Sequence, residues 1–384
     1  MPLNCCTKTI IGYTAGGPIC GPSMFLCSRS LASTISIKAM KLQRSINVVG
    51  CHCAGEVCDV IVGGVLNPSG CNTMYEKLVH FRDKEDHIRQ FLLQEPRGRS
   101  SMCINLVLPP CDPKADAGFL IMESDEYPPM SGGNTIATTT VLLETGMVKM
   151  TEPVTELVLE TPAGLVYVTA ECEDGKCKTV AFDNVPSFVF VLDYKIDVPG
   201  LGIVSADIAW GGMIYAIVDA TSLGIRINNQ NGPQLIEYGE RIKHALQQDS
   251  FIPVHPQNPN IKGVSILEFT EPLQRDTMEA VNTVVVSPGR FDRCPCGTGS
   301  SARMAVLHAR GQLKVGEKFT HRSIIGSTFE CHIRGTQKLG EYDAILPTVK
   351  GSAWINSFKE MVLDASDPWP VGFRVGDQWH VRPA

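Results

Sequence analysis

Apolar and polar positions along the chain predict a succession of short strands with few helices between them. A run rich in Val, Leu and Thr from 157 to 170 is interrupted by a Pro-Ala-Gly turn at 162–164, which predicts a hairpin. Further β-rich runs predict strands at 46–49, 60–65, 180–192, 263–269 and 281–286. Because these strands come in runs and do not alternate regularly with helices, the order favours an α+β fold.

Two segments carry apolar residues at helical spacing. The first, 84–93, is stopped by Pro96, and the second, 233–247, follows a break at 221–224. A third helical signal occurs twice, as a long-period repeat. The segment SGGNTIATTTVLLETG at 131–146 aligns without a gap with CGTGSSARMAVLHARG at 296–311, an offset of 165 residues.

Each copy of the repeat is a polar, glycine-rich turn followed by an apolar helix and a terminal glycine. Gly132 aligns with Gly297, and the closing glycines Gly146 and Gly311 also align. We therefore expect two domains with one equivalent helix each; a chance match of short glycine-containing segments is the alternative.

Composition narrows the class of protein. A length of 384 residues fits two domains at about 150 residues each. The net charge of −6 argues against a nucleic-acid surface, and the chain has no run of about 18 apolar residues that would span a membrane. Fifteen scattered cysteines lack the density of a disulfide scaffold, so we interpret most of them as reduced core residues of an intracellular protein.

The first 50 residues contain no Asp or Glu and several basic residues. This composition is a weak match to a mitochondrial targeting peptide, and an uninformative tail is the favoured interpretation. We treat 1–44 as an N-terminal extension and expect a cytoplasmic protein.

The repeat also predicts chemistry. The start of a helix has unpaired N–H groups and a partial positive charge, so it binds anions such as a carboxylate. Two such starts could hold one carboxylate and stabilise the charge that develops when the neighbouring α-proton leaves. Cys296 precedes the second helix, where the helix start could lower its pKa toward neutrality and make the thiolate a general base. Ser131 precedes the first helix and can donate a proton or a hydrogen bond. With so many cysteines, a buried structural thiol is the alternative for Cys296.

The segment Asp292-Arg-Cys-Pro-Cys-Gly-Thr-Gly-Ser-Ser-Ala-Arg-Met-Ala305 resembles the proline racemase family, and the likeness runs from about Val48 to the C-terminus. The resemblance implies a diaminopimelate-epimerase-like fold with two pseudo-symmetric domains, each a strand barrel around a central helix, and a site in the cleft between them. We place the first domain at 45–185 plus 352–384 and the second at 186–351. Weaker matching motifs lie at 51–56, 95–98, 127–132, 210–219 and 324–329.

By position, the resemblance implies that Cys296 is a catalytic cysteine and that Asp292 holds the substrate amine, with a solvated loop aspartate as the alternative. Backbone donors for the substrate carboxylate would come from Gly132, Gly133, Gly297 and Thr298. The implied partner is a small proline-type amino acid, without cofactor or metal. The sequence leaves the oligomeric state open, a homodimer included.

The chain departs from the racemase pattern at its first motif. Racemases have Met-Cys-Gly-His, whereas this chain has Met130-Ser-Gly-Gly133, and Met213 stands where asparagine is common. Because racemisation needs competent acid–base groups on both faces of Cα, we favour dehydration of trans-3-hydroxy-L-proline by Cys296 and Ser131. The alternatives are a 4-hydroxyproline 2-epimerase, a proline racemase, an inactive protein that binds proline-type ligands, and a thiol-dependent redox or metal protein.

Other cysteines and histidines are interpreted as structural. Cys51, His52, Cys53 and Cys58 lack the spacing of a metal site, and alternation along a strand would point His52 away from its neighbours. Cys294 and His308 are interpreted as packing residues.

Overall fold

Strands dominate the structure, a computed structural model that describes residues 42–287 and 289–375. Within these residues, seventeen strands are hydrogen-bonded into one continuous sheet, and β11 (Val254–His255) and β12 (Asn258–Lys262) form a separate pair. The mixed order of strands and helices is that of an α+β fold, as the sequence predicts. Residues 1–41, which include most of the predicted extension, lie outside the described part of the chain.

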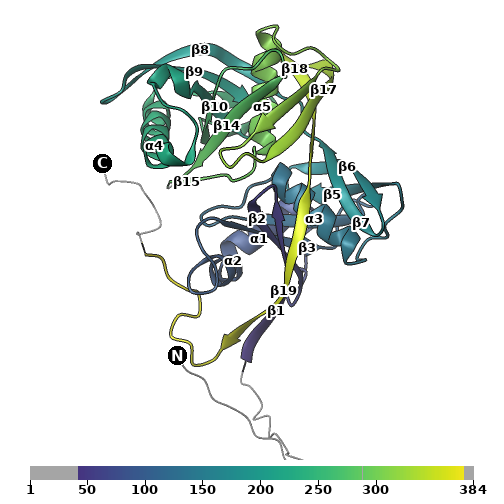
Figure 1. Ribbon diagram of the computed structural model, residues 1–384. Helices are drawn as coiled ribbons and strands as arrows, with labels where there is room; N and C mark the ends of the chain where they lie inside the picture. Colours follow the sequence, from purple (N-terminus) through teal and green to yellow (C-terminus); the bar gives the residue numbers. More distant parts are fainter. Residues whose placement is uncertain (1–41, 288, 376–384) are drawn as a thin grey trace, which may run out of the picture. The chain divides into compact units, whose positions relative to one another are not determined.

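One group of strands surrounds the first repeat helix, α3 (Gly132–Glu144), which packs against β1, β2, β3, β7 and β19 (Figure 1). All residues of α3 from Gly132 to Leu143 are buried. The strands of this group are β1 (Leu42–Cys53), β2 (Glu56–Gly63), β3 (Met102–Leu108), β4 (Ala117–Met122), β5 (Val154–Thr161), β6 (Gly164–Glu173), β7 (Lys176–Asp183) and β19 (Ala353–Asp364).

A second group of strands surrounds the other repeat helix, α5 (Gly297–Ala309), which packs against β8, β9, β10, β17 and β18. The antiparallel pairing of β7 with β18 joins the two groups into one sheet. The strands of this group are β8 (Phe188–Val198), β9 (Gly202–Trp210), β10 (Ile214–Asp219), β13 (Ile266–Thr270), β14 (Glu279–Val286), β15 (Arg290–Phe291), β16 (Lys318–Arg322), β17 (Thr328–Leu339) and β18 (Tyr342–Gly351).

The remaining helices cover these strands from outside. α1 (Met74–Lys84) and α2 (His87–Leu93) bury Phe81, Phe91 and neighbouring apolar side chains against β3 and β4. α4 (Gly232–Gln248) buries the apolar positions of its amphipathic pattern against β8, β13 and β14. Two short 3-10 turns, η1 (Ala220–Leu223) and η2 (Asn229–Asn231), connect β10 to α4. Among the described residues, no helix is both long and apolar enough to span a membrane.

The predicted elements are present, although the run at 180–192 is divided between β7 and β8, and several strands, among them β3, β4, β9 and β17, were not predicted. The hairpin, the strands, the helix 233–247 and both repeat helices are present, and Gly146 and Gly311 end the repeat helices with φ of +73° and +66°. The helix expected at 84–93 begins only at His87, and α1 before it was not predicted. The division into 45–185 plus 352–384 and 186–351 stays a prediction.

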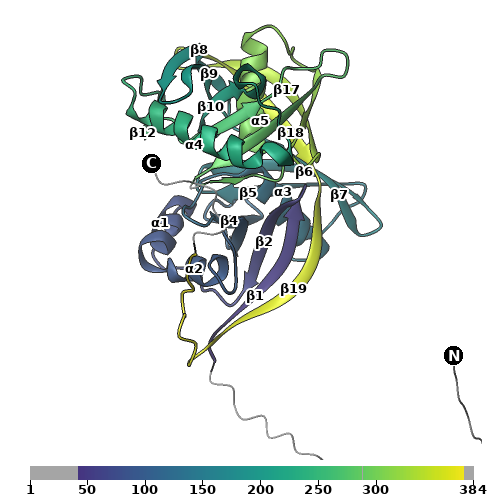
Figure 2. The ribbon, with the colours of Figure 1, turned by 60° about the vertical axis from the view of Figure 1, so that its left-hand side comes forward.

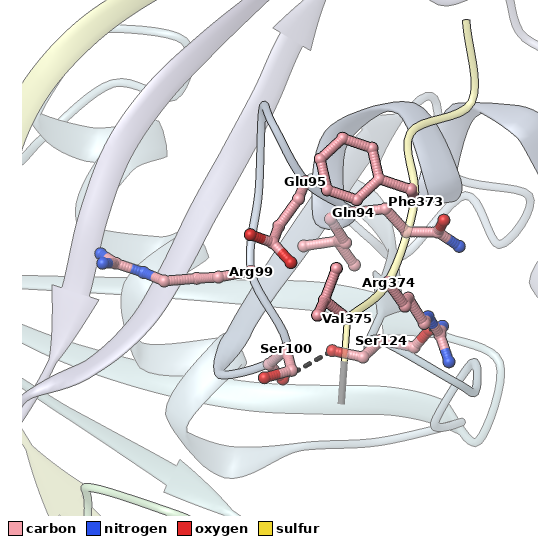
Figure 3. Close-up of a pocket in the computed structure, with 9 residues that line it drawn as sticks. Gln94, Glu95, Arg99, Ser100, Ser124, Phe373, Arg374 and Val375 are labelled. Carbon is pink, nitrogen blue, oxygen red and sulfur yellow. Dashed lines mark hydrogen bonds between the residues drawn. The ribbon is translucent and has the colours of Figure 1, made fainter. Parts of the chain in front are cut away.

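The two ends of the described chain lie along the first group of strands. β1 and β19 pair antiparallel over most of their length, side by side in both views (Figure 2). After β19, the segment 373–375 returns to the loop after α2, where the backbone N–H of Phe373 donates to the carbonyl of Glu95. A small pocket lies between this segment, Ser100 and Ser124 (Figure 3), and none of the predicted site residues lines it.

The cysteines that the structure describes carry free thiols, and most of them are buried. Cys51 and Cys53 are fully buried on one face of β1, whereas His52 lies on the other face and stacks on Trp354 with ring centroids 5.2 Å apart. Alternation along the strand therefore separates His52 from the two thiols, as expected for packing residues.

Candidate active site

The N-termini of α3 and α5 lie directly against each other. A Cβ atom placed on Gly132 would lie 2.9 Å from the Cα of Gly297, and one placed on Gly297 would lie 2.8 Å from the Cα of Gly132. Real Cβ atoms do not approach so closely, so only glycine at both positions permits this contact. Because Ser131 and Cys296 immediately precede these glycines, the contact brings both predicted catalytic residues to one place.

The two helix starts also leave unpaired N–H groups side by side. The first hydrogen bonds back to the residues that precede the helices come from Thr135 to Ser131 and from Ser300 to Cys296, both 2.9 Å long. The N–H groups of the preceding residues therefore have no partner within their helix. These residues include all four predicted backbone donors, Gly132, Gly133, Gly297 and Thr298. The arrangement suits a carboxylate at the junction of the helices, and the donor roles stay predictions.

Ser131 is held by a chain of buried amides. Its backbone is extended, and its Oγ accepts a hydrogen bond of 2.9 Å from Nδ2 of Asn134. Oδ1 of Asn134 in turn accepts a hydrogen bond of 2.8 Å from Nδ2 of Asn105, which is fully buried. The chain fixes the hydroxyl oxygen of Ser131 and leaves its proton available to another acceptor.

Cys296 occupies an unusual backbone conformation. Its φ of +62° lies in the left-handed region, which costs free energy for a residue other than glycine. Such strained residues persist where the surrounding structure imposes them, and they cluster at functional sites. The conformation distinguishes Cys296 from every other described cysteine.

The thiol of Cys296 faces hydroxyl groups. Its Sγ lies 3.2 Å from Oη of Tyr215 and 3.5 Å from Oγ1 of Thr298, and these two oxygens are 2.7 Å apart. Tyr215 is fully buried on β10. Sequence reasoning gave Tyr215 no role, although it lies within the motif at 210–219; its partners are more than 80 positions away along the chain.

The pKa of Cys296 moves opposite to the expected direction. Burial and the Asp292 carboxylate raise it well above its ordinary value, and the hydroxyls of Tyr215 and Thr298 and the N–H of Gly299 oppose this only in part. The prediction that the helix start lowers the pKa toward neutrality is therefore wrong, because burial of the thiolate and the Asp292 carboxylate act in the opposite direction.

Asp292 lies beside this thiol and is not a solvated loop residue. Its side chain is only 16 % exposed, and its Oδ1 lies 3.5 Å from Nη1 of Arg290. Arg290 also contacts two acidic side chains, Glu56 at 3.3 Å and Glu123 at 2.8 Å. Burial raises the pKa of Asp292, and Arg290 opposes this rise. Sequence reasoning identified Asp292 but not the three residues around it.

Comparison with known proteins gives this site a family. The sequence model of a protein family described as proline racemase matches residues 48–374. The chain belongs to the proline racemase family. A hydroxyproline epimerase from Agrobacterium vitis, solved with trans-4-hydroxy-L-proline bound, is 40 % identical with a TM-score of 0.81; the match covers 88 % of this chain and 98 % of that one. A probable proline racemase from Agrobacterium radiobacter K84, solved with carbonate bound, matches with the same values.

More distant structures share the fold. A phenazine biosynthesis protein of the PhzF family from Bacillus anthracis is 13 % identical with a TM-score of 0.52, over 83 % of this chain and 100 % of that one. These neighbours confirm the predicted α+β fold of diaminopimelate-epimerase-like type. Membership of the proline racemase family makes the chain an enzyme of the class that includes amino-acid racemases and epimerases.

A second buried acid lies behind the thiol of this proline racemase-family site. Both groups lie close to Gly299. A Cβ atom placed on Gly299 would lie 2.7 Å from Oε2 of Glu268 and 3.4 Å from Sγ of Cys296. Burial raises the pKa of Glu268 to about 8, against the opposing effect of Arg303. His321 lies 3.6 Å from Oε1 of Glu268, and burial lowers the pKa of the histidine. No motif in the sequence pointed to Glu268 or His321.

We expect Tyr215→Phe to lower kcat/KM by about 10-fold, the value of one hydrogen bond to a charged group. Loss of the hydroxyl removes a group that favours the thiolate of Cys296, so the pKa of the thiol rises and the ascending limb of the pH–rate profile moves to higher pH. Tyr194→Phe is the matched control, since its hydroxyl contacts Asp249 and not the site. If the pH profile of Tyr215→Phe were identical to that of the parent enzyme, Tyr215 would have no influence on the pKa of the Cys296 thiol.

Proposed function

We propose that this enzyme is a 4-hydroxyproline 2-epimerase. Sequence reasoning favoured dehydration of trans-3-hydroxy-L-proline and kept the epimerase as the alternative. The 40 % identical hydroxyproline epimerase with bound trans-4-hydroxy-L-proline supports the alternative more strongly than the dehydratase. The proposal requires that Ser131 act as an acid–base group on one face of Cα and Cys296 on the other.

The interaction between Asn134 and Ser131 is the observation that carries the proposal. A serine hydroxyl is a weak acid unless its alkoxide is stabilised. Here Nδ2 of Asn134 donates to Ser131 Oγ at 2.9 Å, and the residue stands at the positive end of a buried helix. Both features favour the alkoxide, so the absence of a first cysteine does not remove acid–base chemistry from this face.

In the proposed reaction, the substrate carboxylate lies against the N–H groups at the two helix starts. Cys296 takes the α-proton from one face as the C–H bond breaks, and negative charge spreads onto the carboxylate, where the N–H donors stabilise it. Ser131 then gives its proton to the opposite face of Cα. The proton gained by sulfur balances the one lost by oxygen, and the roles reverse for the D-isomer.

Dehydration remains a second candidate because a hydroxyl occupies position 131. With a β-hydroxylated substrate, Cys296 would remove the α-proton while the Ser131 O–H assists the departing hydroxide, giving a cyclic imine after loss of water. The free proton of Ser131, whose oxygen accepts from Asn134, supports this arrangement. An inactive ligand-binding protein would need neither group.

Incubation of the purified protein with trans-4-hydroxy-L-proline in D₂O tests the proposal. We expect deuterium to appear at Cα and cis-4-hydroxy-D-proline to form. Proton NMR measures the deuterium incorporation, and chiral chromatography measures the product. Parallel incubations with trans-3-hydroxy-L-proline and L-proline cover the dehydratase and racemase alternatives. Imine formation from the 3-hydroxy isomer, without inversion of the 4-hydroxy isomer, would establish the dehydratase instead.

Ser131→Ala should separate proton exchange from inversion. With only Cys296 left, we expect exchange of the α-proton of one isomer to continue while inversion falls by about 10²-fold or more, the usual contribution of one general acid. Ser131→Cys is the control, because it restores a proton donor at the same position and should retain inversion. Unchanged inversion by Ser131→Ala would exclude Ser131 from the reaction.

A further inference from the structure

Four side chains beside the site form a buried ionic group, which we call the Arg290 cluster: Glu56, Glu123, Arg290 and Asp292. Glu56 begins β2 and Glu123 follows β4, whereas Arg290 and Asp292 lie at β15. Arg290 contacts all three carboxylates within 3.5 Å, and the side chains of Arg290 and Glu56 are each 5 % exposed. The cluster therefore joins residues that are more than 160 positions apart along the chain.

The cluster contains more acids than bases. One guanidinium faces three carboxylates, and Glu126 adds a fourth acid nearby. Among the groups that face the cluster from other elements, Cys103 is a buried thiol. Arg293 donates its backbone N–H to Glu56, and its positive charge lowers the pKa of Glu56 and of Asp292. Lys243 lowers the pKa of Glu126. Burial raises the pKa of Glu56 and of Glu123 to about 7, in spite of Arg290. Near neutral pH the cluster therefore retains a proton, because among the described residues no second cation forms a side-chain ion pair with its carboxylates.

We propose that the ammonium group of the substrate is this second cation, and that it displaces a proton from the Arg290 cluster when it binds at Asp292. The inference rests on the proposed function, which supplies the ammonium, and goes beyond it by assigning a role to Glu56, Glu123 and Arg290. Arg290 is a positioning residue: it holds Asp292 and shares the negative charge of the cluster. The displaced proton passes to solvent, so the charge that the cluster loses equals the charge that the ammonium brings to it, while the substrate carboxylate is neutralised separately at the two helix starts.

This coupling connects substrate binding to the state of Cys296. The Asp292 carboxylate is one of the causes that hold the pKa of the thiol high. An ammonium beside Asp292 offsets that effect, and the thiolate becomes easier to form once substrate is present. The thiol is then activated mainly in the complex.

Proton release can be counted by titration calorimetry in buffers of different ionisation enthalpy. Cys296→Ala prevents turnover and removes the thiol as a proton source. We expect trans-4-hydroxy-L-proline to release about half to one proton at a pH of about 7, where the cluster titrates. The release should vanish at a pH about two units higher, where the carboxylates are already ionised. Tetrahydrofuran-2-carboxylate, which has the ring and carboxylate but no ammonium, should release none.

Glu123→Gln in the same background identifies the source of the proton. The substitution removes one carboxylate whose described contact is Arg290, so release should fall by at least about half while binding persists. Glu171→Gln, on β6 and paired with Lys350, is the matched control and should leave the proton count unchanged. Binding without proton release, or equal release by Glu123→Gln, would overturn the inference alone. Failure of the hydroxyproline to bind at all would overturn the proposed function as well.

Discussion

We expect turnover to fall by about 10³-fold or more when Cys296 is replaced by alanine, because the proposed reaction then loses its base on one face of Cα. The thiol is the only described side chain that lies at the start of α5 against the hydroxyls of Tyr215 and Thr298. Alanine keeps the left-handed backbone position at the same conformational cost as cysteine. The rate of α-proton exchange in D₂O measures the loss directly, since it does not depend on the second face.

Cys294→Ala is the matched control for this result. Cys294 is a second buried thiol, two residues earlier in the chain, and burial likewise raises its pKa. It makes no contact with Tyr215 or Thr298 among the hydrogen bonds of the described residues, so we expect turnover within about 3-fold of the parent and a stability loss of about 1 kcal/mol for a small cavity. Full activity of Cys296→Ala would disprove its assignment as the base.

Gly297→Ala should also lower activity strongly, for a purely geometric reason. The new Cβ would lie 2.8 Å from the Cα of Gly132 and 2.9 Å from Cζ of Phe182. The backbone could accommodate this Cβ atom only if the starts of α3 and α5 moved apart. The N–H donors of the two helices would then no longer face the same carboxylate. We expect kcat/KM to fall by about 10²-fold or more, and the free energy of unfolding to fall by about 1–3 kcal/mol.

Gly232→Ala serves as the control, since Gly232 is also the first residue of a helix but has room for a methyl group, 3.5 Å from Phe291. Steady-state kinetics and denaturant unfolding of both variants separate the two effects. If Gly297→Ala kept both activity and stability, the close contact of the helix starts would have no functional importance.

The choice of reaction is the point that the residues alone left open. The absence of a cysteine at position 131 led to an expectation of dehydration, on the argument that serine is a poor partner in inversion. The structure supplies what that argument lacked, since Asn105 and Asn134 support the Ser131 oxygen from two other positions along the chain. Asn134 stands inside the repeat, but nothing in a linear sequence says that Asn105 faces it.

Features that depend on local pattern could be predicted from the amino-acid sequence. β-rich runs predicted several of the strands, and the glycine-bounded repeat predicted α3 and α5 with Ser131 and Cys296 at equivalent positions. These features are readable because a strand, a helix and its terminal glycine are each specified within a few neighbouring residues. The block around Cys296 also indicated the family that the comparisons confirm.

The electrostatics of the site depend on contacts between distant parts of the chain. Tyr215 reaches Cys296 from β10, and the Arg290 cluster assembles residues from β2, β4 and β15. The direction of the Cys296 pKa was predicted wrongly because it depends on desolvation and on Asp292, not on the helix start alone. Burial and long-range pairing are properties of the packed chain, and they set the charge of the groups that the sequence could only name.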